Sequence, residues 1–468
     1  MIEKTTLNAI NKMIEEIIKN KIYSNRAAEV FTELYGKNEV DSACVRYTAL
    51  LKDFIKLPES ELCNTEGCLR IFTSPGRTEL AGNHTDHNRG KVLAASIQLD
   101  CAAIVQKRND NVVFFRSAGF PDVKVKLVNE NGKPDLDPKP EERGTTEALI
   151  RGIAAEFQKR GRRAGGFSAN AESAVLPGSG LSSSAALEVL FGKIFDSLYG
   201  GEKIAAKAAS ALEIAQIGQI AENQYFGKPC GLMDQTACAT GGAAAIDFSD
   251  AANPVVKKIN FNLENAGYIL CVVNTGGSHA DLTADYASIP AEMKAAASFF
   301  GKSVLREIDK ETVLGSARDL RKALGDRALL RALHFFDENI RVDAMAAALQ
   351  EMEKAASSAA KQEILYKYFD LVNESGASSW ELLQNVFSPN CPESQGISAA
   401  LALTNDFFRK RGLRGACRVH GGGFAGTIQT YLPKDALNAY CAYIEKIFGV
   451  NAVTPLRIRP VGALDLEF

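Results

Sequence analysis

The sequence predicts an α+β fold divided into two domains. Segments typical of strands and of helices are mixed along the chain without a regular strand–helix–strand alternation, which disfavours a doubly wound parallel sheet. The chain has 468 residues, more than a single hydrophobic core usually serves. Its composition, with 46% apolar and 24% charged residues, is that of an ordinary globular protein.

The first half of the chain is expected to begin with helices and to continue as a sheet. Residues 1 to about 65 show an amphipathic helical pattern that becomes irregular. Alternating segments between residues 70 and 128 are typical of strands joined by turns. Residues 145–161 have helical spacing and a terminal glycine, and residues 165–177 alternate like a strand.

The second half repeats the mixture of strands and helices. A strand is predicted at residues 268–274, and long alanine-rich helices between about 291 and 385. A further helix is expected near 396–411, with a strand after the glycines at 421–426. The turn-rich composition of residues 250–265 places the domain boundary there, so we expect one domain at 1–260 and another at 261–468.

Charge and apolar patterning exclude several classes of partner. The formal net charge of −2 gives no reason to propose nucleic acid or an anionic membrane as a partner. No apolar run approaches the ~18 residues of a membrane-spanning helix, and the first residues lack a signal-peptide core. The scattered cysteines are typical of reduced thiols, so we expect a cytoplasmic protein.

The stretch from Ser74 to Leu93 raises the first functional question, because it places many polar side chains on what we expect to be a short connection. A metal site and a site for a hydroxyl-rich substrate both fit such a set. The fragment His84-Thr-Asp86-His87 could supply metal ligands. A metal-dependent hydrolase pattern requires a further leading histidine, and Gly82 occupies that place.

Two glycine-rich segments could approach phosphate groups. Residues 177–191 are expected to run from a strand through a glycine-rich turn into a helix that serines open, and the free amides of a helix start attract anions. The segment lacks the lysine of a Walker sequence, and a capped helix after a tight turn is the alternative. The glycines at 421–426 match G-x-G-x-x-G, but a strand rather than a helix follows them, which disfavours a dinucleotide fold.

Taken together, several motifs resemble those of the galactokinase family in the GHMP kinase superfamily. They are Ser74 to Asn88, "GLSSSAA" (180–186), "AENQYFGKPCGLMDQ" (221–235), "NTGGSHADLTADY" (274–286), "SPNCPES" (388–394) and "GGGFAG" (421–426). The resemblance implies a two-domain GHMP kinase fold, with an N-terminal domain like domain 2 of ribosomal protein S5 and a ferredoxin-like C-terminal domain. It also implies ATP-dependent phosphorylation of D-galactose at the anomeric hydroxyl to give α-D-galactose 1-phosphate.

The same resemblance implies a role for each matching residue. Asp234 and Arg77 would be catalytic, and Ser184 and Glu222 would hold Mg²⁺. The sugar would be bound by Asn83, His84, Asp86, Gly231 and Tyr286. ATP would be bound by Pro177, Gly178, Ser179, Gly180, Leu181, Ser182, Ser183, Gly422 and Gly423. The expected partners are a small sugar and ATP, without nucleic acid or membrane, in a monomer or weak homo-oligomer.

Three positions depart from the family motif. Asn83 stands where the family has a glutamate expected to bind the sugar 6-hydroxyl, Glu79 where it has asparagine, and His87 where it has tyrosine. Loss of the charge at position 83 would tolerate a carboxylate on the sugar, so galacturonate or another galacto-configured sugar is the alternative substrate. A non-catalytic regulator that binds sugar and ATP on the same fold is the alternative of another class. We assign no function to the insertion between Gly36 and Ile71.

Overall fold

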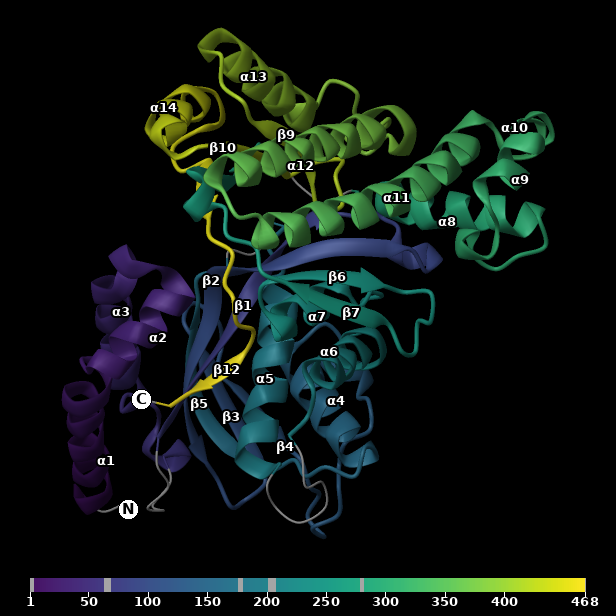
Figure 1. Cartoon of the computed structure of the whole chain (residues 1–468). Helices are drawn as coiled ribbons and strands as arrows, with labels where there is room; N and C mark the ends of the chain where they lie inside the picture. The colour runs from purple at the N-terminus through teal and green to yellow at the C-terminus, as the bar shows by residue number, and fades with distance from the viewer. Residues whose placement is uncertain (1–3, 63–68, 176–179, 201–207, 278–281, 468) are drawn as a thin grey trace.

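The computed structural model describes residues 4–62, 69–175, 180–200, 208–277 and 282–467. Two sheets organise the chain, with helices on both faces of each (Figure 1). Among the described residues, no helix is long and apolar enough to cross a membrane.

The first sheet contains eight strands in the order β12-β1-β2-β5-β3-β4, with β6 paired to β2 and β7 paired to β6. All neighbours are antiparallel except β3 and β5, which are parallel. The strands are β1 (Arg70–Ala81), β2 (Lys91–Lys107), β3 (Val112–Ser117), β4 (Val123–Lys126), β5 (Phe167–Ser173), β6 (Ala243–Asp247), β7 (Val255–Ile259) and β12 (Leu464–Leu466).

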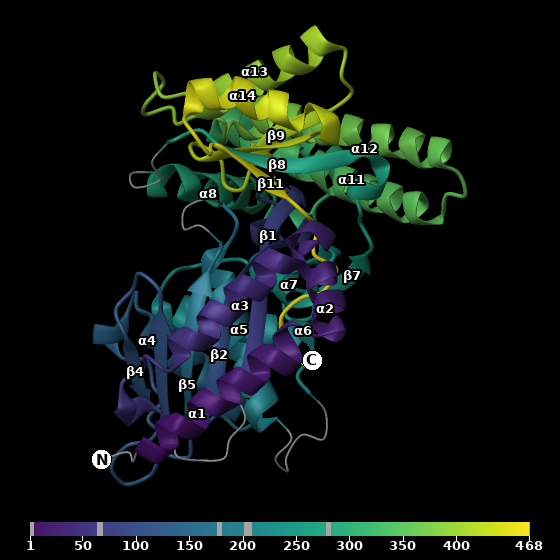
Figure 2. The ribbon, with the colours of Figure 1, turned by 90° about the vertical axis from the view of Figure 1, so that its left-hand side faces the viewer.

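Both faces of this sheet are buried, because successive side chains of each strand point to opposite faces. Ala103 and Val105 of β2 face the core formed with the later helices, while Ala102 and Ile104 face the N-terminal helices. The N-terminal helices are seen in front of the strands in Figure 2. They are α1 (Lys4–Ile17), α2 (Asn25–Tyr35) and α3 (Val40–Phe54), and the opposite face carries α4 (Thr146–Lys159), α5 (Ser183–Tyr199), α6 (Ala211–Ile220) and α7 (Met233–Thr240).

The second sheet has the antiparallel order β11-β8-β10-β9. Its strands are β8 (Tyr268–Asn274), β9 (Ala416–His420), β10 (Thr427–Pro433) and β11 (Val453–Leu456). One face packs on α13 (Gly396–Arg411) and α14 (Leu437–Phe448). The other face packs on α12 (Ser358–Ser378), where Tyr368 and Phe369 contact Tyr431.

The remaining helices extend beside the second sheet and over the end of the first (Figure 1). They are α8 (Thr283–Phe299), α9 (Lys310–Gly315), α10 (Ala317–Leu324) and α11 (Asp326–Lys354). Strands up to Ile259 belong to the first sheet, and those from Tyr268 to Leu456 belong to the second. The last strand, β12, returns to pair with β1. The domain limits 1–260 and 261–468 stay a prediction.

The structure confirms the predicted helix at 145–161 as α4 and the predicted strand at 268–274 as β8. The expectation that Ser74 to Leu93 is one connection is wrong, since residues 74–81 belong to β1 and the connection is residues 82–90. Register shifts between Pro75 and Arg77 and between Glu79 and Ala81 give the strand the bulges that accommodate a proline.

Candidate active site

The irregular strand β1 places Arg77 against the serine-rich segment that opens α5. The backbone N–H of Arg77 donates to the carbonyl of Leu181 over 3.0 Å. A Cβ at Gly76 would come 2.7 Å from that same carbonyl oxygen. Glycine therefore allows the close approach of β1 to this segment.

Arg77 and Asp234, which are 157 positions apart, form a bidentate ion pair. The Arg77 Nε and Nη2 atoms donate to the two oxygens of Asp234 over 2.7 and 2.6 Å. The hydroxyl of Ser182 donates to Asp234 as well, and Arg77 Nη1 donates to the carbonyl of Gly180. Burial alone would lower the pKa of Arg77, but the Asp234 carboxylate outweighs it and raises that pKa above its ordinary value.

The Asp234 carboxylate remains accessible in this arrangement. Its side chain is 31% exposed, whereas that of Arg77 is 8% exposed. Asp234 lies in the first turn of α7 and lines a cavity of about 190 Å³ together with Arg77. The pair can thus present a fixed negative acceptor and a fixed positive group to one small molecule.

Most of the predicted sugar-binding residues line the cavity. It is lined by Arg77, Glu79, Asn83, His84, Asp86, His87, Pro229, Cys230, Gly231, Met233, Asp234, Gly421 and Gly422. A Cβ at Gly231 would lie 2.1 Å from Oδ2 of Asp86. Residue 231 must be glycine for the Asp86 carboxylate to keep its place.

His84 contributes a neutral imidazole in a left-handed backbone conformation, with φ of 60°. Its Nε2 lies 2.9 Å from the carbonyl of Gly422, which can only accept, so Nε2–H donates. Burial lowers the pKa of His84 to about 4. The ring therefore ties the connection after β1 to the glycine segment of the second sheet.

Tyr286 lies behind that glycine segment and is not among the residues that line the cavity. Its hydroxyl donates to the carbonyl of Gly423 over 2.9 Å, and a Cβ at Gly422 would lie 2.4 Å from its ring. Burial raises the pKa of Tyr286 to about 12. Gly422, expected at the ATP site, lines the same cavity as Asp234.

The start of α5 offers the features of an anion site. Gly180 and Ser182 adopt positive φ of 71° and 60°, and Ser183 and Ser184 open the helix. The 17-residue helix presents its free amides and the positive end of its dipole at this point. Leu181 is buried beneath the turn. Pro177, Gly178 and Ser179 lie outside the described residues.

The predicted metal residue Glu222 is buried at a π-helical turn, Ala221–Phe226, that continues α6. Lys228 Nζ lies 3.0 Å from Glu222 Oε1, and Gln235 donates to Oε2 over 3.0 Å. The same Gln235 amide donates to Glu188, whose other oxygen is buried without a partner among the described residues. Burial and the nearby Glu222 raise the pKa of Glu188 well above its ordinary value.

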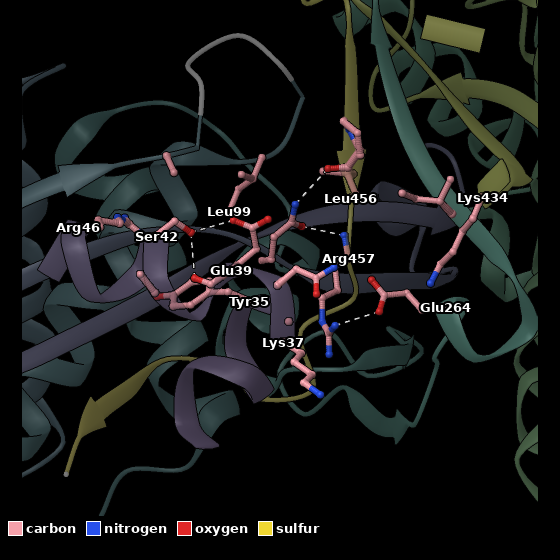
Figure 3. Close-up of a pocket in the computed structure, with 17 residues that line it drawn as sticks. Tyr35, Lys37, Glu39, Ser42, Arg46, Leu99, Glu264, Lys434, Leu456 and Arg457 are labelled. Atoms are coloured by element: carbon pink, nitrogen blue, oxygen red, sulfur yellow. Dashed lines mark hydrogen bonds and ion pairs between the residues drawn. The ribbon is translucent and has the colours of Figure 1, made fainter. Parts of the chain in front are cut away.

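A larger cavity lies elsewhere in the part of the chain that the structure describes. Its volume is about 780 Å³, and it separates the N-terminal helices from the second sheet (Figure 3). Tyr35, Arg46 and Arg457 are among its lining residues, and none of the predicted site residues is. The predicted catalytic residues and most of the predicted sugar-binding residues line the smaller cavity instead.

Comparison with known proteins decides the family. A galactokinase from Glaesserella parasuis is 30% identical over 370 residues, which are 78% of this chain and 86% of that protein. The chain belongs to the galactokinase family. A galactokinase from Streptomyces coelicolor is 29% identical over 83% of this chain and 91% of its own length. The family models "Galactokinase galactose-binding signature" and "GHMP kinases N terminal domain" match residues 60–107 and 148–242.

The fold agrees with that of a solved galactokinase. The crystal structure of Lactococcus lactis galactokinase complexed with galactose superposes with a TM-score of 0.65 at 24% identity, covering 94% of this chain and 99% of that one. The α+β, two-domain GHMP kinase fold expected from the motifs is confirmed.

Sequence reasoning assigned no role to several residues around the site. Glu79 was noted only as a departure from the galactokinase motif, yet it lines the cavity. Glu188 lies four residues after Ser184, so helical spacing places both on one face of α5. Spacing could have indicated Glu188, but nothing in the sequence shows that one of its oxygens is left without a partner.

Proposed function

We propose that this protein catalyses the ATP- and Mg²⁺-dependent phosphorylation of D-galactose at its anomeric hydroxyl, giving α-D-galactose 1-phosphate and ADP. The observation that carries the proposal is the Arg77–Asp234 pair in a cavity that also contains His84 and Asp86. The galactokinases to which the chain is similar support the choice of substrate.

The reaction requires alignment and charge neutralisation more than covalent help from the protein. The sugar hydroxyl would donate to the accessible Asp234 carboxylate while its oxygen forms a bond to the terminal phosphorus of ATP. The bond from that phosphorus to the bridging oxygen of ADP breaks, and the hydroxyl proton passes to Asp234 or to solvent. Arg77 holds Asp234 in place and offsets negative charge on the transferring group.

The triphosphate is assigned to the start of α5. The amides near Ser183 and Ser184, with the dipole of α5, favour phosphate oxygens, and this point adjoins Asp234 through the Ser182 hydroxyl. The family motif assigns Pro177, Gly178 and Ser179 to ATP as well, and they lie outside the described residues.

The residues assigned to Mg²⁺ provide the oxygen donors that this ion prefers. Ser184 and Glu222 would hold it, and Glu188 Oε1, which has no partner among the described residues, would add a third donor. Mg²⁺ held there would neutralise charge on the phosphate oxygens. Lys228 pairs with Glu222, so its ammonium group would compete with Mg²⁺ for that carboxylate.

We further propose that the protein acts in the cytoplasm on a free sugar, as a monomer or weak homo-oligomer, without nucleic acid or membrane partners. The net charge of −2 supports the absence of a polyanionic partner.

The deciding experiment measures ADP release with ATP, Mg²⁺ and a panel of hexoses. We expect galactose-dependent turnover that falls at least ~100-fold in kcat in Asp234→Ala, the usual scale for a positioned acid–base group. Sugar binding without turnover would instead indicate the non-catalytic regulator. Near-normal turnover of Asp234→Ala would remove Asp234 from the mechanism.

A further inference from the structure

Glu79 is a buried carboxylate inside the proposed sugar cavity that the reaction does not use. It lies on β1 two residues after Arg77 and lines the cavity with Arg77 and Asp234. Only 4% of the residue is exposed. Burial raises the pKa of Glu79, while Arg418 and Arg77 act in the opposite direction.

Among the described residues, one oxygen of Glu79 accepts two hydrogen bonds and the other accepts none. Oε1 accepts from Arg418 Nη2 over 2.7 Å and from Asn83 Nδ2 over 3.0 Å. Arg418 is itself buried on β9 of the second sheet and also donates to the carbonyl of Leu80. Oε2 makes no hydrogen bond to any described residue. The arginine thus fixes a carboxylate with one acceptor oxygen available to a bound molecule.

Asn83, in contrast, uses its side-chain amide in hydrogen bonds to the protein. Its Nδ2 donates to Glu79 and to the carbonyl of Gly421 over 2.6 Å. Its Oδ1 accepts from Asn385 over 2.7 Å. Both N–H groups are used, so Asn83 can offer a sugar only the remaining lone pair of Oδ1.

These contacts change the interpretation of the two sequence departures. Positions 79 and 83 carry glutamate and asparagine, the reverse of the order in the family motif, and the two side chains are hydrogen-bonded to each other. The negative charge missing from position 83 is therefore present in the same cavity, at position 79.

We infer that Glu79 is a specificity-determining residue, whose Oε2 accepts a hydrogen bond from a non-reacting hydroxyl of the sugar and whose charge rejects the corresponding hexuronate. This inference rests on the proposed sugar kinase function. A hydroxyl satisfies a buried acceptor, whereas a second carboxylate would bring two like charges together in a desolvated space. Galacturonate is accordingly disfavoured as the substrate.

The test compares kcat/KM for D-galactose and D-galacturonate in the wild type and in Glu79→Gln. Glutamine can still accept from Arg418 but removes the charge. We expect the galactose-to-galacturonate ratio to fall at least ~10-fold. Hydrogen bonds to charged groups are about twice as strong as neutral ones, and that difference corresponds to about a tenfold change in affinity. Glu61→Gln is the matched control, since Glu61 is also buried and pairs with Arg108 at 2.9 Å; it should leave the ratio unchanged.

An active Glu79→Gln enzyme with the wild-type ratio would overturn the inference. If Glu79→Gln fails to fold because the buried Arg418 loses its counter-charge, the double variant Glu79→Gln with Arg418→Gln removes both charges and should show the same fall. A wild type that phosphorylates neither sugar would refute the proposed function itself, whereas an active wild type with an insensitive ratio refutes only the role of Glu79.

Discussion

Replacing Gly231 with alanine should damage sugar binding by displacing one carboxylate. The added Cβ would lie 2.1 Å from Oδ2 of Asp86, and contacts under 3.0 Å essentially do not occur. The carboxylate must therefore move by about 1 Å, a displacement that can cost on the order of 100-fold in rate when it misplaces a substrate. We expect kcat/KM for the sugar to fall by about 10- to 100-fold in Gly231→Ala, mostly through KM.

Steady-state kinetics with varied galactose and saturating ATP measure this effect, and thermal melting checks the fold. Gly315→Ala is the matched control, because a Cβ at Gly315 at the end of α9 would meet no atom within 4 Å. A Gly231→Ala enzyme that melts like the wild type and keeps its KM for galactose would refute the placement of Asp86 at the sugar.

Three further predictions concern the catalytic pair, the metal and pH. Arg77→Lys cannot form the bidentate pair with Asp234, so kcat should fall at least ~10-fold with little change in KM for galactose. An unchanged kcat in ADP-release assays would contradict a catalytic role for this ion pair. Lys228→Met removes the ammonium group that pairs with Glu222 and should lower the Mg²⁺ concentration for half-maximal activity several-fold. A Mg²⁺ titration in which that concentration rises would contradict the proposed site. His84, whose pKa is lowered to about 4 in the folded state, binds its proton more readily in the unfolded chain, so stability should fall as pH drops from about 6.5 to 4. His84→Asn should flatten this fall in melting temperature, and an equally steep fall would rule His84 out as its source.

Local patterns predicted the elements well where one period dominates. The helical spacing of residues 145–161 and the apolar run at 268–274 agree with α4 and β8. The polar residues of β1 were mistaken for a connection, because Pro75 and Gly76 suggest a turn. The bulges that accommodate them depend on pairing with β2, which local sequence does not reveal.

Some features of the candidate site could be predicted from its motifs, and others depend on tertiary contacts. Arg77 and Asp234 were expected together from their motifs, and the fold brings them together. Tyr286 was expected at the sugar; its ring lies against Gly422 and is not among the residues that line the cavity, so its role stays a prediction. The role of Glu79 depends on Arg418, a residue 339 positions away, and no spacing rule connects the two.

The most direct test of the central claim is a crystal structure with galactose and a non-hydrolysable ATP analogue. The anomeric oxygen should lie within about 3 Å of the Asp234 carboxylate and in line with the terminal phosphate, which Arg77 should adjoin. A sugar bound in the larger cavity near Arg457, or a terminal phosphate remote from Arg77 and Asp234, would contradict the account.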